Sequence, residues 1–146
     1  MSKSGVDVTE AWRALVYAHD RLIRIFDAHL RDRHGLTKPA FDVLRRLLET
    51  KGYRSRTQEL AQALFYSSGS ATKVVDRLVE RGLVERSAHD TDRRVVFVSL
   101  TPAGLDLARK VLKEHQALVR KSLAQFESAT EAHHVLAYLR RLASDA

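Results

Sequence analysis

Apolar residues recur at helical spacing through two stretches near the N-terminus. In the first, which begins at Thr9, they fall every three or four positions and predict one continuous amphipathic helix. Gly35 is expected to close this helix, because glycine readily takes the left-handed conformation that follows many helices. Thr37 then caps a second helix, with Pro39 in its first turn, which runs to about residues 51–52.

A short helix is predicted around the segment ELAQAL (59–64). Ser55 and Gln58 have the spacing of a capping box, in which two side chains satisfy free backbone N–H groups at a helix start. A start at Arg56 or at Thr57 fits the sequence equally well.

The next helix is predicted to begin after Ser67 and to end at Gly82. Its apolar positions follow the spacing i, i+3, i+4, i+7 and i+8, and they are Ala71, Val74, Val75, Leu78 and Val79. Its opposite face is polar and consists of Ser70, Lys73, Asp76, Arg77 and Glu80. A short helix, a tight turn and a second helix with a polar outer face are typical of a helix-turn-helix unit.

Beyond Gly82 the pattern changes to that of short strands. Residues 83–86 and 95–100 read as two strands joined by the charged loop SAHDTDRR (87–94). A long helix follows.

This long helix begins at Thr101-Pro102 and is predicted to reach about Phe126. Ser128 and Glu131 have capping-box spacing for a last helix, whose apolar positions recur at helical intervals.

Composition places the chain among globular proteins that suit an anionic partner. It is 45% hydrophobic and 29% charged, with a net charge of +7. No apolar run approaches the ~18 residues of a membrane span, and the first residues lack the apolar core of a signal peptide. The 146 residues contain no cysteine, which excludes disulfides and thiolate metal sites. We therefore expect one cytoplasmic domain and no membrane partner.

A helix-turn-helix followed by a two-stranded ribbon is a winged helix, and in this order the chain resembles the MarR family of bacterial transcriptional regulators. The segments that carry the resemblance are LTKPAFDVLRRL (36–47), ELAQAL (59–64), SSGSATKVVDRLVERGLVER (67–86) and DRRVVFVSLTPAG (92–104). It implies a mainly α fold with a small two- to three-stranded β-wing. It also implies a DNA-binding lobe at about 36–101, with dimerisation helices at about 8–34 and 102–144.

The family reads DNA with the helix that follows Ser67. Small residues at a helix start let backbone N–H groups approach phosphate, and the next turn faces base edges in the major groove. The residues expected to contact DNA are Ser67, Ser68, Ser70, Thr72, Lys73, Arg77, Arg93 and Arg94. The alternative is that Lys73 and Arg77 are solvated surface residues paired with Asp76 and Glu80.

The charged loop HDTDRR (89–94) is the predicted wing tip. The resemblance implies that Arg94 enters the minor groove, where a narrow groove has strong negative potential. Asp90 and Asp92 would repel phosphate unless they orient the arginines, and we assign them that role. A solvated hairpin with local ion pairs is the alternative.

Family members often have glycine in the turn of the helix-turn-helix, where this chain has Phe65-Tyr66. A different turn geometry is therefore possible, and Gly69 weakens the first turn of the DNA-reading helix by about 1 kcal/mol relative to alanine.

The family resemblance also implies an effector pocket between the DNA-binding lobe and the dimerisation helices. Residues that suit a small aromatic acid there are Trp12, His19, Phe26, Phe41, Arg45 and His115. Each aromatic residue is equally explained as core, and a histidine on an apolar stripe is more often a hydrogen-bonded core residue than a ligand.

The expected function is a homodimeric repressor that binds a pseudo-palindromic operator in double-stranded DNA and responds to a small molecule. Two other classes stay open: a winged-helix protein-interaction module, and a ligand-binding or catalytic protein without an operator. No nucleophile elbow, phosphate loop or zincin motif is present, so we expect no enzyme and no cofactor. Histidines 29, 34, 133 and 134 lack i, i+4 spacing, so no metal site is expected, and zinc sensing stays open only as an alternative.

Overall fold

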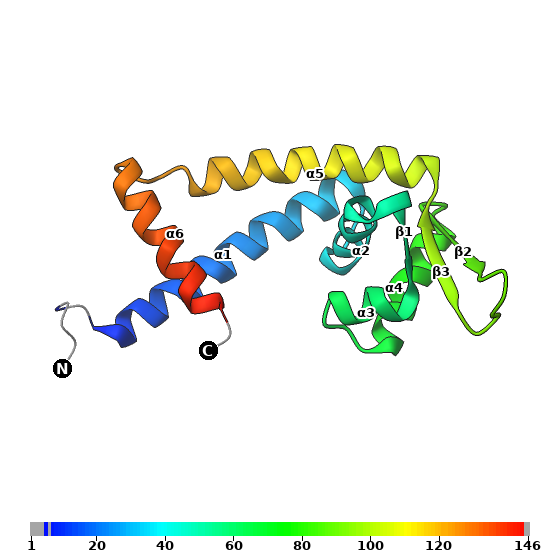
Figure 1. Cartoon of the computed structure of the whole chain (residues 1–146). Coiled ribbons are helices and arrows are strands. Elements are labelled where there is room, and N and C mark those ends of the chain that lie inside the picture. Colours follow the sequence, from blue (N-terminus) through cyan, green and yellow to red (C-terminus); the bar gives the residue numbers. More distant parts are fainter. Residues whose placement is uncertain (1–4, 6, 145–146) are drawn as a thin grey trace. The chain divides into compact units, whose positions relative to one another are not determined.

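The computed structural model describes residue 5 and residues 7–144 (Figure 1). They form six α-helices and one three-stranded sheet, which confirms the predicted mainly α winged helix-turn-helix. The contacts divide the chain into a unit that ends at His115 and a second one that starts at Gln116. None of the described helices combines the length and the apolar character that a bilayer crossing needs.

The first unit contains most of the regular structure. Its elements are α1 (Val8–His34), α2 (Lys38–Glu49), the 3-10 helix η1 (Lys51–Tyr53), β1 (Arg54–Arg56), α3 (Thr57–Ala63), α4 (Ser68–Glu80), β2 (Val84–Ala88), β3 (Val96–Leu100) and the first part of α5 (Pro102–Leu123). The second unit contains the rest of α5 and α6 (Ala129–Ala143).

Local capping explains where α1 and α2 begin and end. Asp7 caps α1 by accepting a 2.8 Å hydrogen bond from the Thr9 N–H, so the helix starts slightly earlier than predicted from Thr9. Gly35 ends α1 with a left-handed φ of 60°. Thr37 accepts from the Ala40 N–H and begins α2, as predicted.

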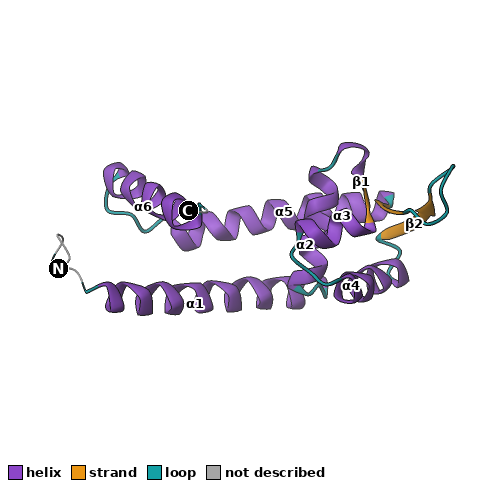
Figure 2. Ribbon diagram, turned by 60° about the horizontal axis from the view of Figure 1, so that its bottom comes forward, coloured by secondary structure: helices purple, strands orange, loops and turns teal. Residues whose placement is uncertain are grey.

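The sheet, whose strands are orange in Figure 2, has the strand order β1-β3-β2, and both pairings are antiparallel. β2 and β3 are the predicted hairpin, shifted by one residue at their starts. The sequence did not predict β1, and the presence of this strand shows that the capping box predicted from Ser55 is wrong. Ser55 lies in β1 opposite Val98, and α3 begins at Thr57 without a side-chain cap. The open alternative start at Thr57 is therefore the observed one.

The core of the first unit lies where α2, α4, the sheet and α5 meet. Its fully buried side chains include Leu30, Leu36, Leu44, Leu47, Leu60, Val75, Leu78, Val84, Val98 and Val111. On α4, Ala71, Val75 and Leu78 are buried as predicted, whereas Val79 at the end of the stripe is exposed. Burial on this face leaves the polar face of α4 toward solvent.

In the second unit the predicted cap at Ser128 is observed, because the Glu131 N–H donates to Ser128 Oγ (3.1 Å). The Glu131 carboxylate accepts from the N–H of Glu127 (2.6 Å), one residue before the Ser128 N–H that a capping box would use. α5 ends at Leu123, before the predicted Phe126. No residue of α6 is buried, although the helix carries apolar positions along its length.

Candidate nucleic-acid interface

The start of α4 presents small side chains and backbone N–H groups to solvent. Ser67 is the N-cap, and its Oγ accepts a hydrogen bond from the Ser70 N–H (3.1 Å). Ser68, Gly69 and Ser70 are all exposed in the first turn. The positive end of the helix dipole therefore lies at an accessible surface, which favours an anionic group there.

The two cations of α4 extend into solvent without acidic partners. Lys73 and Arg77 form no ion pair with any residue that the structure describes. Asp76, the partner expected for Lys73 in the alternative interpretation, instead binds Arg86 of β2 at 2.7 Å. The same Arg86 guanidinium approaches the Thr72 carbonyl (3.5 Å). Glu80, the partner expected for Arg77, forms no ion pair with the residues that the structure describes.

An open groove of ≈ 740 Å³ runs between α3, α4 and the base of the wing. Three of the residues predicted to contact DNA lie along it: Ser68, Thr72 and Arg94. The other lining residues are Arg56, Thr57, Gln58, Ala61, Gln62, Tyr66, Asp76, Arg86, Val95 and Val96. The groove joins the start of α4 to the wing, which are 22 or more positions apart in sequence.

Sequence reasoning missed the contribution of β1 and α3 to this groove. Arg56, Gln58 and Gln62 line it with polar side chains that can donate hydrogen bonds to phosphate oxygens. Their type was visible in the sequence. Their position was not, because it depends on β1 pairing with β3.

The wing tip is a turn that Asp92 holds. Its carboxylate accepts a 3.0 Å hydrogen bond from the Arg94 N–H, and the Val95 N–H donates to the Asp92 carbonyl (3.1 Å). Asp92 therefore fixes the backbone that carries Arg94, rather than its guanidinium. Arg93 and Arg94 both lie in this turn and outside β3, so the alternation of side chains along a strand does not apply to them.

The turn between α3 and α4 retains a left-handed residue although it lacks glycine. Phe65 has a φ of 56°, and its side chain is 96% exposed. Next to it, Tyr66 Oη donates to Asp42 Oδ2 (3.0 Å), and Lys38 Nζ lies 2.8 Å from the same oxygen. Burial, followed by the Asp42 hydrogen bond and charge, raises the pKa of Tyr66 to about 12. This network attaches the start of α4 to α2.

The expected effector residues do not all come together within one chain. The His115 ring centroid lies 4.9 Å from those of Phe26 and Phe41. Burial lowers the pKa of His115, and the charge of Arg45 lowers it further. Arg45 itself binds Glu49 at 2.9 Å. These contacts form a partly buried aromatic cluster with a cation beside it.

Trp12 and His19 lie apart from that cluster. Trp12 is 65% exposed, and its separation of 14 positions from Phe26 in one helix corresponds to about 21 Å along the axis. His19 is also exposed and contacts Asp20 at 3.2 Å, so it is not a core residue within the chain. His115, by contrast, packs against the core residue Phe41.

Comparison with known proteins agrees with this geometry. The model of the MarR family matches residues 34–95, which include α2, α3, α4 and β2. The HTH-type transcriptional regulator MhqR of Bacillus subtilis is 32% identical over 120 residues, which cover 80% of this chain and 81% of that protein.

Two solved structures extend the likeness across nearly the whole chain. AbsC, a MarR family transcriptional regulator from Streptomyces coelicolor, superposes with a TM-score of 0.83 at 28% identity, covering 97% of this chain and 96% of AbsC. Sco3205 from the same organism, solved in complex with DNA, has the same fold, with a TM-score of 0.83 at 23% identity and coverages of 97% and 90%. The chain belongs to the MarR family of transcriptional regulators.

Proposed function

We propose that the protein binds a pseudo-palindromic operator in double-stranded DNA as a homodimer and represses transcription by covering that site. The observation that carries the proposal is the groove between the open start of α4 and the wing tip, together with unpaired cations on α4. Sco3205, with the same fold, is solved in complex with DNA. A net charge of +7 adds long-range attraction to phosphate.

In this proposal the first turns of α4 enter the major groove. Backbone N–H groups at Ser68 and Gly69 bind phosphate, while Ser70 and Lys73 face base edges. Arg77, one turn further along, binds the DNA backbone. Ser67 contributes as the cap that keeps the helix start open, because its hydroxyl is already bonded to Ser70.

The wing supplies the second contact. Arg94 enters the minor groove, where its guanidinium lies in strong negative potential, and Arg93 binds the adjacent backbone. Asp92 has its carboxylate turned to the Arg94 N–H. That hydrogen bond partly offsets the repulsion between an aspartate and nearby phosphate.

A homodimer follows from apolar side chains that are exposed in each unit. In α1, Val8, Trp12 and Tyr17 are largely exposed, and in α6, Leu136, Leu139 and Leu142 are. A second copy would remove these side chains from water. Two DNA-reading helices would then address half-sites about 10 bp apart. Sedimentation should give a dimer at micromolar concentration, and a monomer would contradict this part of the proposal.

Operator binding would respond to a small aromatic anion at the cluster of Phe26, Phe41 and His115, with Arg45 as the cation. Trp12 and His19 are too far along α1 to join this cluster in the same chain, and in the proposal they face the second copy. Thermal-shift screening of aromatic acids against wild type and Arg45→Ala tests this response. Identical shifts in both proteins would contradict it.

The deciding experiment compares Arg94→Ala with wild type on an operator obtained by selecting bound genomic fragments. Loss of one cation from the minor groove should weaken binding by about 1–3 kcal/mol. It should also reduce the slope of log K against log[salt] by about 0.9. Lys73→Ala should in addition relax discrimination among operator variants, because a lost base contact changes specificity.

Lys113→Ala is the matched control. It removes one exposed positive charge from α5, which Figure 1 shows along the opposite side of the first unit from α3 and α4. Its salt slope should equal that of wild type. Arg93→Ala would not serve as this control, since Arg93 shares the wing turn with Arg94. If Arg94→Ala binds like wild type, or if no fragments are enriched, the wing contact or operator binding itself is refuted.

A further inference from the structure

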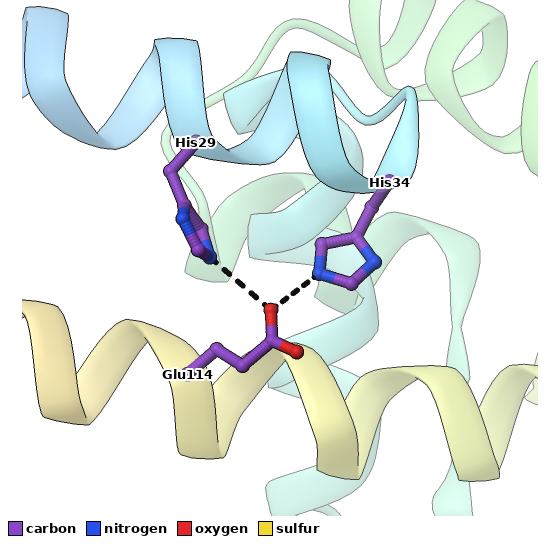
Figure 3. Close-up of side chains that lie close together, drawn as sticks. All are labelled: His29, His34 and Glu114. Atoms are coloured by element: carbon purple, nitrogen blue, oxygen red, sulfur yellow. Dashed lines mark hydrogen bonds and ion pairs between the residues drawn. The ribbon is translucent and has the colours of Figure 1, made fainter.

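Three potential metal ligands converge between the end of α1 and α5, within the first unit. His29 and His34 project from α1 toward Glu114 of α5, and Figure 3 shows both rings directed at one carboxylate oxygen. His29 Nε2 lies 3.2 Å and His34 Nε2 lies 2.6 Å from Glu114 Oε2. The three ligand atoms all lie within 4.8 Å of one another.

We propose that His29, His34 and Glu114 form a binding site for a divalent transition metal, with zinc as the best-fitting ion. Two imidazoles and one carboxylate are a ligand set that zinc uses when a water fills its fourth position. Tetrahedral zinc with bonds of about 2.0–2.1 Å holds its ligand atoms about 3.3 Å apart. The observed 3.2 Å already matches this separation, and the 2.6 Å contact must lengthen by about 0.7 Å to admit an ion.

Burial favours an ordered site over adventitious surface binding. The His34 side chain is only 7% exposed, and those of His29 and Glu114 are 22% and 25% exposed. By comparison, the His19–Asp20 pair has side chains that are 68% and 56% exposed and has no third ligand. Partly buried ligands lose little conformational freedom on binding an ion, because their rotamers are already fixed.

The protonation chemistry of the cluster is compatible with a metal. A glutamate carboxylate is ionised at neutral pH. An ionised carboxylate only accepts hydrogen bonds, and both Nε2 atoms therefore donate to it in the metal-free protein. Binding requires each neutral imidazole to move its proton to Nδ1, after which both Nε2 lone pairs face the ion.

One neighbouring charge works against the ion. Lys110, one turn before Glu114 in α5, acts on the same carboxylate. Replacing it with alanine should therefore tighten metal binding without removing a ligand. This increase in metal affinity is opposite to the decrease expected for the ligand substitutions.

The site adjoins a contact with the DNA-reading helix. Arg81, which caps the end of α4, donates hydrogen bonds of 3.0 Å to the carbonyls of His34 and Gly35. A metal that fixes His34 would also fix this attachment of α4. Metal binding can be measured without DNA, and operator binding can be measured without metal, so either proposal can fail alone.

The test uses full-length protein stripped with a chelator and then titrated with zinc chloride in the calorimeter. Wild type should bind one zinc ion per chain. Glu114→Gln and His34→Gln should each weaken this binding at least about tenfold. His19→Gln should bind like wild type, and Lys110→Ala should bind more tightly.

A second measurement needs no variant and covers the case in which the ligand substitutions impair folding. In the ¹⁵N NMR spectrum of the wild type, zinc should shift the Nε2 resonances of His29 and His34 and leave those of His133 and His134 unchanged. Absence of one-equivalent binding would overturn the proposal. Zinc binding that survives in folded Glu114→Gln, or that shifts His133 and His134 instead, would overturn it as well.

Discussion

Gly104→Ala is expected to destabilise the junction between the wing and α5. A Cβ at residue 104 would lie 1.8 Å from the Leu83 carbonyl oxygen and 2.8 Å from its carbon. This oxygen is not free to move, because it accepts the Thr101 N–H at 3.1 Å. Thr101 is held in turn through Oγ1, which donates to the Gly82 carbonyl (2.6 Å) and accepts from the Gly104 N–H (3.0 Å).

The magnitude follows from these contacts. Backbone must shift by about 1 Å to admit the methyl group, and such overpacking typically costs about 1–3 kcal/mol. Loss of the Thr101–Leu83 hydrogen bond adds about 0.5–1.5 kcal/mol. We expect the free energy of unfolding to fall by about 2–4 kcal/mol, which lowers Tm by roughly 5–15 °C for a chain of this size. Urea denaturation at a fixed protein concentration measures this change in the free energy of unfolding.

Gly69→Ala is the matched control, since it makes the same chemical change where space is open. A Cβ at residue 69 meets nothing within 4 Å. Alanine should stabilise the first turn of α4 by up to about 1 kcal/mol. The added methyl group should nevertheless weaken operator binding, because it holds phosphate away from the backbone. If the stability lost in Gly104→Ala is smaller than the stability gained in Gly69→Ala, the close approach at Leu83 is refuted as a determinant of the fold.

Two further predictions concern the turn and the aromatic cluster. Phe65→Asn should raise the free energy of unfolding by about 1 kcal/mol in urea denaturation, because asparagine tolerates the φ of 56° that strains phenylalanine. A loss of stability would contradict this prediction and show that the exposed ring makes a needed contact. The pKa of His115 is lowered from 6.5, so the folded state favours the neutral imidazole. The stability that neutral His115 contributes is therefore complete above pH 6.5. This contribution is lost as the pH falls toward the folded-state pKa. Wild type should therefore lose more stability than His115→Gln between about pH 7 and about pH 5, and parallel curves would contradict this.

Signals that act over a few residues predicted much of the fold. Helical periodicity located α1, α2, α4 and α6, and the caps at Thr37, Ser67 and Ser128 are where side-chain oxygens meet free N–H groups. Helix α1 begins before the predicted Thr9, because the Asp7 carboxylate caps it by accepting a hydrogen bond from the Thr9 N–H. Capping depends on neighbours three positions away, and such neighbours are visible in a sequence.

Pairing over long distances accounts for what the sequence did not predict. β1 has three polar residues, Arg54, Ser55 and Arg56, and no strand-like alternation identifies it. It is a strand because β3, more than 40 positions later, offers an open edge. The role of Asp92 was also not visible in the sequence, because its carboxylate binds the Arg94 N–H and not a guanidinium.

The placement of α4 shows the same dependence on distant residues, and it bears directly on function. At its start, Tyr66 donates to Asp42 of α2 at 3.0 Å, and at its end Arg81 donates to the His34 and Gly35 carbonyls. Its buried stripe fixes which face is outward, whereas these two polar attachments determine how the helix is aimed relative to α1 and α2. A change at the end of α1 therefore has a direct route to α4, the helix that we propose reads DNA. The unpaired state of Lys73 depends on the same principle, because Arg86 reaches across from β2 to bind Asp76, the acid three positions after Lys73.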